Sequence, residues 1–371
     1  MRDGRRIIDT DCHQMEPASM WEKYIDARFR GEAPRRAKLG GHETMVVEGG
    51  SLTAEEGKYP MNSPEFIAAL VRGMKRFTRA RESRFDATSR LADMDEEGVD
   101  AQILYPTVGG QLLGREFKNP ELLAACCRAY NDWSSEYCSA APERLRWAAM
   151  LPLQEPRLAV EEARRTAEMG AVSCYVRPNP SLGRNLHHPD FFPIWREVER
   201  LELPICLHDS GSPRIPSYGD RMETHTTGHI IAHPFEAMAA MMSLIWYGIF
   251  ERFPALTVVH VEADAGWLPY WLQRMEQHWE FSGKAEHAEM MRSPTEYFLS
   301  NVYVAARGDE RTLPSVVDLV GDDNLLFNTD YPHPDGTWPW GMERLDEQPI
   351  SEESKRKILW DNAARAFRLP M

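Results

Sequence analysis

The chain has 371 residues, of which 43% are hydrophobic and 27% are charged, and its formal net charge is −14. This composition is typical of a soluble globular protein, and the negative charge argues against nucleic acid or an anionic membrane as the partner. No apolar run approaches the roughly 18 residues needed to cross a bilayer, and no signal-peptide core follows the N-terminus. We therefore expect a cytoplasmic protein without a membrane partner, and a homo-oligomer, as is common for soluble enzymes.

Apolar segments typical of strands alternate along the chain with amphipathic segments of helical period. Strands are predicted at residues 6–13, 100–106, 145–153, 171–177, 204–208, 256–262, 297–306 and 324–329. Helices are predicted at residues 89–98, 120–141, 156–170, 188–201, 229–253, 267–281 and 310–321, and at 351–359 and 362–369 near the C-terminus. This alternation predicts an α/β fold with a parallel sheet. Eight strands favour a (β/α)₈ TIM barrel over a doubly wound sheet, since no Gly-rich phosphate-binding turn follows a strand.

Two segments interrupt the alternation. Residues 18–85, which contain two Gly-Gly pairs, are predicted to be a large insertion after the first strand. Residues 209–228 form a long loop rich in Gly and Pro after the fifth strand. Loops that follow barrel strands lie at the mouth where active sites are built. We expect one barrel domain over residues 1–371, with 18–85 as an insertion or cap.

Several strands end in side chains that bind metals. Asp11 and His13 are two positions apart at the end of the first strand, so both point to the same face. His208 ends the fifth strand and Asp330 follows the eighth. Closing the barrel would bring strands one and eight together. Two imidazoles and two carboxylates could then bind one divalent cation, with Zn²⁺ expected first and Mn²⁺ or Fe²⁺ as alternatives.

Glu262 ends the sixth strand at the same mouth, where it could be a further metal ligand, a general acid or base, a substrate-orienting group, or purely structural. By strand alternation, Asp9 would lie below Asp11, and His260 below Glu262, in the barrel interior. Cys206 and Asn328 would complete this polar layer. We predict that His260 hydrogen-bonds to Glu262 or a polar neighbour; a core histidine bonded to a backbone carbonyl is the alternative.

Five further side chains are candidates for binding substrate. Arg177 could clamp a carboxylate at the end of the fourth strand, or form a salt bridge with a nearby acid. His229 and His233 share a helix face if that helix begins by His225, and could lie near the site or away from it. His333 follows Asp330, and Trp338 could line an apolar pocket or belong to ordinary packing.

The sequence resembles the amidohydrolase superfamily, in the branch that includes aminocarboxymuconate-semialdehyde decarboxylase and the nonoxidative benzoate decarboxylases. The resemblance rests on residues 8–17, 90–100, 248–256 and 266–269, and on Asn328-Thr329-Asp330-Tyr331-Pro332-His333-Pro334. It implies a metal-dependent TIM barrel whose ligands match Asp11, His13, His208 and Asp330.

Two departures from this family pattern affect the functional interpretation. Asp11 replaces the usual histidine or glutamate, and Glu262 replaces the catalytic histidine of the decarboxylases. Since no lysine ends strand four, a carbamylated bridge between two metals is not expected, and one metal is predicted.

Three functions remain as hypotheses. The first is a hydrolase that cleaves an ester, thioester or amide of a mostly apolar or aromatic acid, using metal-activated water and Asp330 as the base. The alternative is nonoxidative decarboxylation of an aromatic or unsaturated acid, with Asp330 protonating carbon. Glu262 argues against it, because a second carboxylate repels an anionic substrate. The third is an inactive barrel that serves as a binding subunit.

Overall fold

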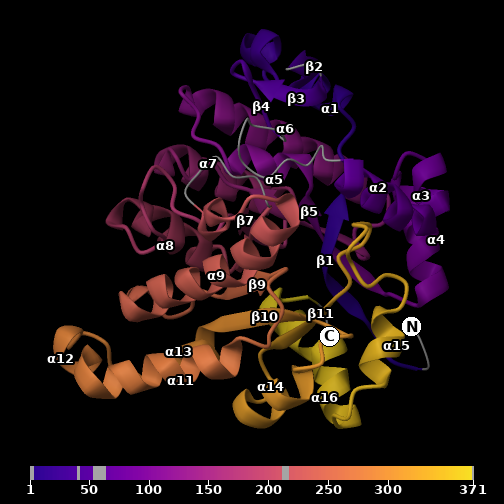
Figure 1. Cartoon of the computed structure of the whole chain (residues 1–371). Helices are drawn as coiled ribbons and strands as arrows, with labels where there is room; N and C mark the ends of the chain where they lie inside the picture. The colour runs from indigo at the N-terminus through magenta and orange to yellow at the C-terminus, as the bar shows by residue number, and fades with distance from the viewer. Residues whose placement is uncertain (1–3, 40–41, 53–63, 211–216, 370–371) are drawn as a thin grey trace.

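A computed structural model of the chain describes residues 4–39, 42–52, 64–210 and 217–369. Eight parallel strands form one sheet in the order β1-β5-β6-β7-β8-β9-β10-β11 (Figure 1). Their bounds are β1 (Ile8–Gln14), β5 (Ala101–Pro106), β6 (Leu145–Met150), β7 (Ser173–Val176), β8 (Ile205–His208), β9 (Val258–Val261), β10 (Val302–Arg307) and β11 (Leu325–Asn328). The predicted TIM barrel is confirmed, and each predicted strand overlaps one of these eight.

The first and last strands close the barrel through a few backbone contacts. Cys12 forms an isolated parallel bridge with Tyr331. The His13 N–H donates to the Tyr331 carbonyl over 2.6 Å, and the Asp330 N–H donates to the Asp11 carbonyl over 2.9 Å. The expected proximity of strands one and eight is thus confirmed at the residues that carry the candidate ligands.

Helices cover the outside of the barrel. Those on the barrel and at the C-terminus are α4 (Ala87–Glu97), α5 (Val108–Leu113), α6 (Pro120–Cys138), α7 (Pro156–Glu168), α8 (Phe192–Arg200), α9 (His225–Trp246), α10 (Ile249–Arg252), α11 (Leu268–His278), α12 (Lys284–Glu286), α13 (Pro294–Asn301), α14 (Leu313–Val320), α15 (Gly341–Asp346), α16 (Glu352–Arg356) and α17 (Asn362–Ala366). Short 3₁₀ segments η3 (Pro189–Phe191) and η4 (Tyr218–Arg221) precede α8 and α9, and π-helical segments η5 (Trp279–Gly283) and η6 (Lys357–Asp361) follow α11 and α16.

The predicted seventh strand, residues 297–306, is too long at its start. Helix α13 occupies 294–301, because Ser293 caps it with Glu296 in a reciprocal capping box and Pro294 opens its first turn. The aromatic and β-branched character of this segment had suggested a continuous strand. The last residues of the predicted strand do form β10.

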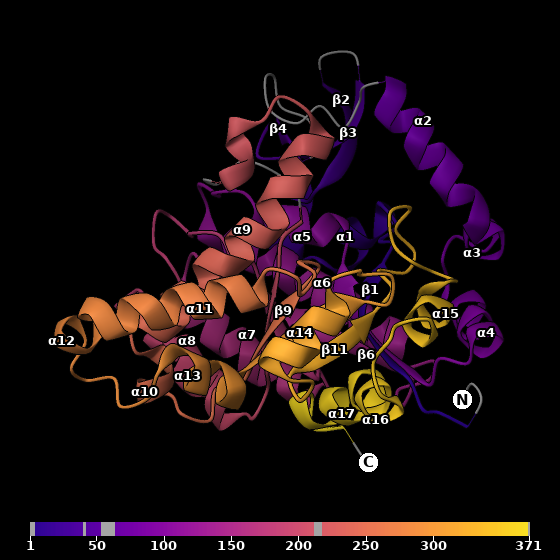
Figure 2. The same cartoon turned by 60° about the horizontal axis from the view of Figure 1, so that its bottom comes forward.

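The insertion after β1 contains a small antiparallel sheet and several helices. Its elements are α1 (Ser19–Tyr24), η1 (Ala27–Glu32), β2 (Arg35–Leu39), β3 (His42–Val47), β4 (Gly50–Ser51), α2 (Pro64–Gly73), η2 (Met74–Phe77) and α3 (Thr78–Glu82). Figure 2 shows the small sheet, α2 and the first turns of α9 at one end of the barrel, with both chain termini at the other end. The insertion therefore stands at the mouth, where the strands end.

Alternate residues of the strands belong to two buried clusters. Tyr105, Cys206 and Val259 belong to a cluster that fills the barrel interior, whereas Leu104 and Val258 pack among the outer helices. All six cysteines are buried free thiols. Among the described residues, no helix is long and apolar enough to span a membrane.

Candidate metal centre and active site

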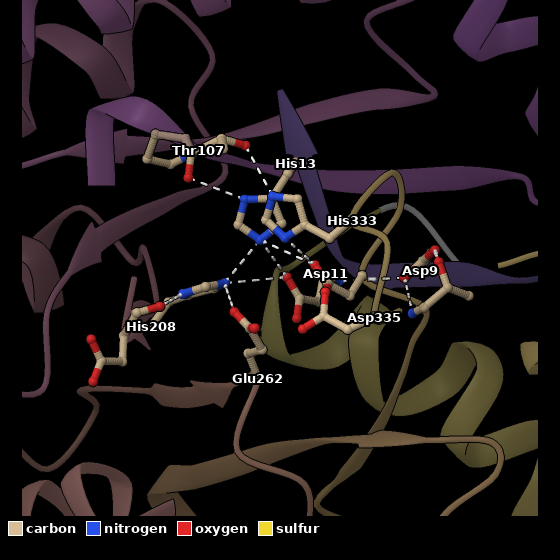
Figure 3. Close-up of polar contacts among 12 residues, drawn as sticks. Asp9, Asp11, His13, Thr107, His208, Glu262, His333 and Asp335 are labelled. Carbon is tan, nitrogen blue, oxygen red and sulfur yellow. Dashed lines mark hydrogen bonds and ion pairs between the residues drawn. The ribbon is translucent and has the colours of Figure 1, made fainter. Parts of the chain in front are cut away.

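Five acidic and histidine side chains converge at the carboxyl ends of four barrel strands (Figure 3). They are Asp11 and His13 of β1, His208 of β8, Glu262 after β9 and Asp330 after β11. One ligand atom from each of Asp11, His13, His208 and Glu262 lies within 4.8 Å of the others. Asp330 lies next to this group, because its Oδ1 is 3.4 Å from His13 Nε2.

The two histidines of this group have their tautomers fixed by backbone carbonyls. His13 Nδ1 donates to the Pro106 carbonyl over 3.1 Å, and His208 Nδ1 donates to the Asp209 carbonyl. Each neutral ring therefore directs an Nε2 lone pair toward the centre, and these two nitrogens are 3.0 Å apart. Two facing lone pairs repel each other, so the arrangement is stable only with a cation between them or a proton on one of the rings.

Asp11 supplies negative charge to the same point. Both of its carboxylate oxygens are buried without a hydrogen-bond partner among the described residues, while Oδ1 lies 3.4 Å from His13 Nε2 and 3.5 Å from His208 Nε2. Burial alone would raise the pKa of Asp11, but the two imidazoles lower it below its ordinary value. The anionic carboxylate is thus directed at the two lone pairs.

Glu262 reaches the mouth through an unusual backbone conformation. Its φ of 53° lies in the left-handed region, which costs free energy for a residue other than glycine and is common at functional sites. The turn ends β9 and directs the carboxylate inward, with Oε2 3.1 Å from His208 Nε2. Burial would raise the pKa of Glu262, but His233 and His208 hold it well below the usual range.

Asp330 forms a dyad with His333. Its φ is 58°, and its Oδ1 lies 2.9 Å from His333 Nδ1, while His333 Nε2 is 3.2 Å from the Thr107 hydroxyl. Burial and the neighbouring carboxylates raise the pKa of Asp330 well above its ordinary value. Burial would lower the pKa of His333, but Asp330 raises it to about 10. Each of the two groups therefore retains a proton at higher pH than it would alone.

A cavity of about 500 Å³ opens beside these groups. Asp330, Glu262, His229, His233 and Trp267 are among the residues that line it. The Trp267 ring is fixed because its Nε1 donates to the carbonyls of Ala263 and Asp264, over 3.0 and 2.9 Å. The volume is within the range of small-molecule sites.

The spacing of the donors fits a divalent cation. Ligand atoms bound at about 2.1 Å lie about 3.0 Å apart in octahedral and about 3.4 Å apart in tetrahedral arrangements. The contacts among Asp11, His13 and His208 are 3.0, 3.4 and 3.5 Å. Together with Asp11's lack of hydrogen-bond donors, these distances make the cluster a suitable metal site.

Comparison with known proteins agrees with this geometry. A family model described as amidohydrolase matches residues 8–369. The chain belongs to the amidohydrolase family. Its resemblance to this family, inferred from the motifs, is therefore confirmed.

Several relatives of this amidohydrolase family member are decarboxylases. The gamma-resorcylate decarboxylase of Rhodococcus jostii is 30% identical over 299 residues, covering 76% of this chain and 87% of that protein. The 2-amino-3-carboxymuconate-6-semialdehyde decarboxylase of Dictyostelium discoideum is 27% identical over 284 residues, covering 75% and 76%. A solved 5-carboxyvanillate decarboxylase from Novosphingobium aromaticivorans, complexed with manganese and 4-hydroxy-3-methoxy-5-nitrobenzoic acid, superimposes with a TM-score of 0.71 at 22% identity, covering 99% and 97%.

These relatives contradict the predicted acyl hydrolase and favour the alternative, a decarboxylase. The physical reason for the error lies in Glu262, whose charge was treated as uncompensated. In the structure, His208, His229 and His233 all lie within 3.5 Å of its carboxylate. A second carboxylate surrounded by imidazoles is a weaker obstacle to an anionic substrate.

Only some of the candidate substrate-binding residues face the site. Helix α9 begins at His225, as the shared-face prediction required, so His229 and His233 face Glu262. Arg177 forms a buried ion pair with Asp209 and donates to Ser210, which matches its predicted salt-bridge alternative.

Trp338 is 6% exposed and packs against Tyr331, with ring centroids 4.7 Å apart, rather than lining the cavity. Ordinary packing, the second interpretation of this residue, therefore describes its position.

Two of the four residues in the predicted polar layer, His260 and Asp9, do not take their predicted positions. His260 has the opposite orientation to Val259 and Val261, beside Trp267, and neither of its nitrogens has a hydrogen-bond partner among the described residues. Asp9 bonds to Thr329 because a bulge in β1, between Asp9 and Cys12, reverses the alternation. Cys206 and Asn328 do face the interior and the cavity, respectively.

Sequence reasoning missed four residues of the site. Trp267 belongs to a quoted family motif but had no assigned role, and Asp335 lies two residues after His333. Thr107 directly follows a strand, which is a usable signal. Arg307, the last residue of β10, lines the cavity and pairs with Asp309 at 2.9 Å. The long loop 209–228 could be assessed only in part, because 211–216 lie outside the described residues.

Proposed function

We propose that this protein is a metal-dependent nonoxidative decarboxylase of a hydroxy-substituted aromatic carboxylic acid. The observation that carries the proposal is the position of Asp330, between the imidazole–carboxylate cluster and the cavity, with His333 behind it at 2.9 Å. A proton on Asp330 would then lie beside a bound aromatic ring. The decarboxylases among the relatives support the same reaction.

Asp11, His13, His208 and Asp330 would hold the cation, with Glu262 as a further donor. When bound, the cation polarises the carboxylate and the neighbouring hydroxyl of the substrate and neutralises their charge. Five donors with three carboxylates exceed the four that zinc usually takes and suit Mn²⁺. A related decarboxylase structure contains manganese. We therefore propose Mn²⁺ in place of the Zn²⁺ expected from the sequence.

The proton required by the reaction would come from Asp330. Its carboxyl transfers a proton to the ring carbon that bears the carboxylate, the bond between that carbon and the carboxylate breaks, and its electron pair restores the aromatic ring as CO₂ leaves. His333 then returns a proton to Asp330, and Thr107 orients the His333 ring through Nε2. The net reaction consumes one proton and releases one CO₂.

The cavity walls fit a flat aromatic acid. Trp267, Pro234 and Ile230 offer apolar surface for the ring. Arg307 supplies a positive charge to the cavity lining. His229 and His233 complete the wall at Glu262.

The test is a panel of hydroxybenzoates, including gamma-resorcylate and 5-carboxyvanillate, incubated with the Mn²⁺-loaded protein while CO₂ is measured. We expect CO₂ from at least one acid and a loss of about 10²-fold or more in kcat for Asp330→Asn. Asp318→Asn, at an exposed position of α14, is the matched control. Absence of CO₂ from every acid would favour the inactive-barrel hypothesis, and full activity of Asp330→Asn would remove Asp330 from the reaction.

A further inference from the structure

The two carboxylate oxygens of Glu262 face different sets of side chains. Oε2 lies 3.1 Å from His208 Nε2, in the cluster that includes Asp11 and His13. Oε1 lies 3.4 Å from His229 Nε2 and 3.5 Å from His233 Nε2, both on helix α9. Glu262 therefore stands between two groups of nitrogen donors, only one of which matches the metal site expected from the sequence.

The α9 group is prepared to bind a cation. His229 and His233 are one helical turn apart, and their rings lie side by side with centroids 3.9 Å apart. His233 Nδ1 donates to the His229 carbonyl over 3.2 Å, so loss of the Nε2 proton to a cation would direct the Nε2 lone pair at Glu262. His229, His233 and Glu262 each present a ligand atom within 4.8 Å of the others.

The distances favour a shared cation over direct hydrogen bonds. Charge-assisted N–H···O bonds are typically about 2.7–2.9 Å long, shorter than the 3.4 and 3.5 Å measured here. Ligands of one tetrahedral cation bound at about 2.1 Å are separated by about 3.4 Å. Two histidines and one glutamate are also a known donor set for a divalent cation with open positions.

We propose that a second divalent cation binds between His229 Nε2, His233 Nε2 and Glu262 Oε1, so that Glu262 bridges two metal sites. Asp335 Oδ2 lies 3.9 Å from His229 Nε2, within reach as a further ligand. The sequence predicted one metal because strand four lacks a bridging lysine. Glu262, after strand six, provides a different bridge.

The charge of the cavity supports the same conclusion. The cavity is lined by one arginine, Arg307, and by five carboxylates: Glu262, Asp264, Glu310, Asp330 and Asp335. One divalent cation at the first site leaves Asp264, Glu310 and Asp335 against Arg307 alone, which opposes entry of an anionic acid. A second cation at His229 and His233 offsets this charge and would mediate their predicted contact with the substrate. That role in substrate binding rests on the proposed function, whereas the metal site does not.

The experiment is a titration of metal-free protein with Mn²⁺, followed by EPR and by elemental analysis after gel filtration. We expect two Mn²⁺ per chain, with a magnetically coupled spectrum because a carboxylate joins the two ions. His229→Ala/His233→Ala should bind one Mn²⁺ and lose the coupling. His225→Ala is the matched control: it lies one turn earlier on α9, outside the donor group, and should retain two.

One Mn²⁺ per chain in the wild-type protein would overturn the second site, as would two coupled ions in the double variant. The number of Mn²⁺ ions bound by the wild-type protein tests the second site even if the double variant does not fold. If the wild-type protein binds one Mn²⁺ per chain and releases CO₂, the second site is wrong and the decarboxylase proposal stands. Two coupled ions without CO₂ release would support the site and contradict the reaction.

Discussion

The imidazole of His333 stacks on that of His13, with ring centroids 3.9 Å apart and an angle of 23° between the planes. His13 directs its Nε2 into the candidate metal cluster, while His333 directs Nδ1 at Asp330. In the proposed reaction these two adjacent rings have separate roles: His13 would present a lone pair to the cation, and His333 would carry a proton.

Replacing His333 by Phe tests whether His333 acts in proton transfer rather than in metal binding. The aromatic ring keeps the stack on His13, but both contacts, with Asp330 and with Thr107, are lost. We expect kcat for CO₂ release to fall by about 10²-fold, with little change in KM or Mn²⁺ content. His225→Phe is the control. Loss of Mn²⁺ from His333→Phe would show that His333 is a ligand instead.

Removing a donor from the first site should weaken metal binding and lower stability. Asp11→Asn and His208→Ala should each contain less Mn²⁺ after gel filtration, while Asp318→Asn should match the wild type. Chelation should also lower the Tm of the wild-type protein, because a ligand at 100 times its Kd stabilises the folded state by about 2.7 kcal/mol. Unchanged Mn²⁺ content in both donor variants would contradict the assignment of this site.

Glu16 should make stability depend on pH. This partly exposed carboxylate accepts hydrogen bonds from the backbone N–H groups of Thr107, Val108 and Gly109 at 2.9–3.1 Å. Burial nevertheless raises its pKa from 4.5 to about 7. Because the folded-state pKa is the higher one, the stabilisation from protonation is complete below pH 4.5 and is lost as pH rises through 7.

The measurement is the free energy of unfolding of the wild type and of Glu16→Gln at pH 5 and pH 8. We expect the difference between the two proteins to change by about 2–3 kcal/mol across this interval, with the wild type losing more stability at pH 8. A constant difference would mean that Glu16 titrates alike in the folded and unfolded protein.

Sequence patterns predicted most of the fold and the donors at the strand ends, because strand alternation and chain order determine which residues reach the barrel mouth. They failed where the backbone departs from regular geometry. The bulge between Asp9 and Cys12 reversed the expected direction of Asp9, and the left-handed turn at Glu262 separated this residue from the face of His260. Neither irregularity has a glycine to signal it.

His260 offers a test of that correction. Its two nitrogens are buried without a hydrogen-bond partner among the described residues, and burial lowers its pKa to about 3. His260→Leu removes these unsatisfied groups, so we expect the free energy of unfolding to rise by about 1 kcal/mol with Mn²⁺ content and kcat unchanged. A loss of Mn²⁺ would restore the predicted supporting role.

Arg76 connects the insertion to the loop that carries His333. One of its guanidinium nitrogens donates to the carbonyls of His333 and Gly336, over 3.0 and 2.8 Å. Arg76→Ala should loosen this loop, lowering kcat several-fold and increasing amide hydrogen exchange at residues 333–336. Arg72→Ala, at an exposed position of α2, is the control. Unchanged exchange would show that the loop is held by other contacts.

The barrel closes where Asp11 and His13 meet Asp330 and Tyr331. The donors of the first metal site therefore come from both ends of the chain, and the set is complete only after residue 330 has been synthesised and has docked against the first strand. A nascent chain on the ribosome, or one truncated before β11, cannot assemble this set of ligands. Capture of a cation by these donors would consequently be a late event in the life of each molecule, because it must follow the synthesis of residue 330.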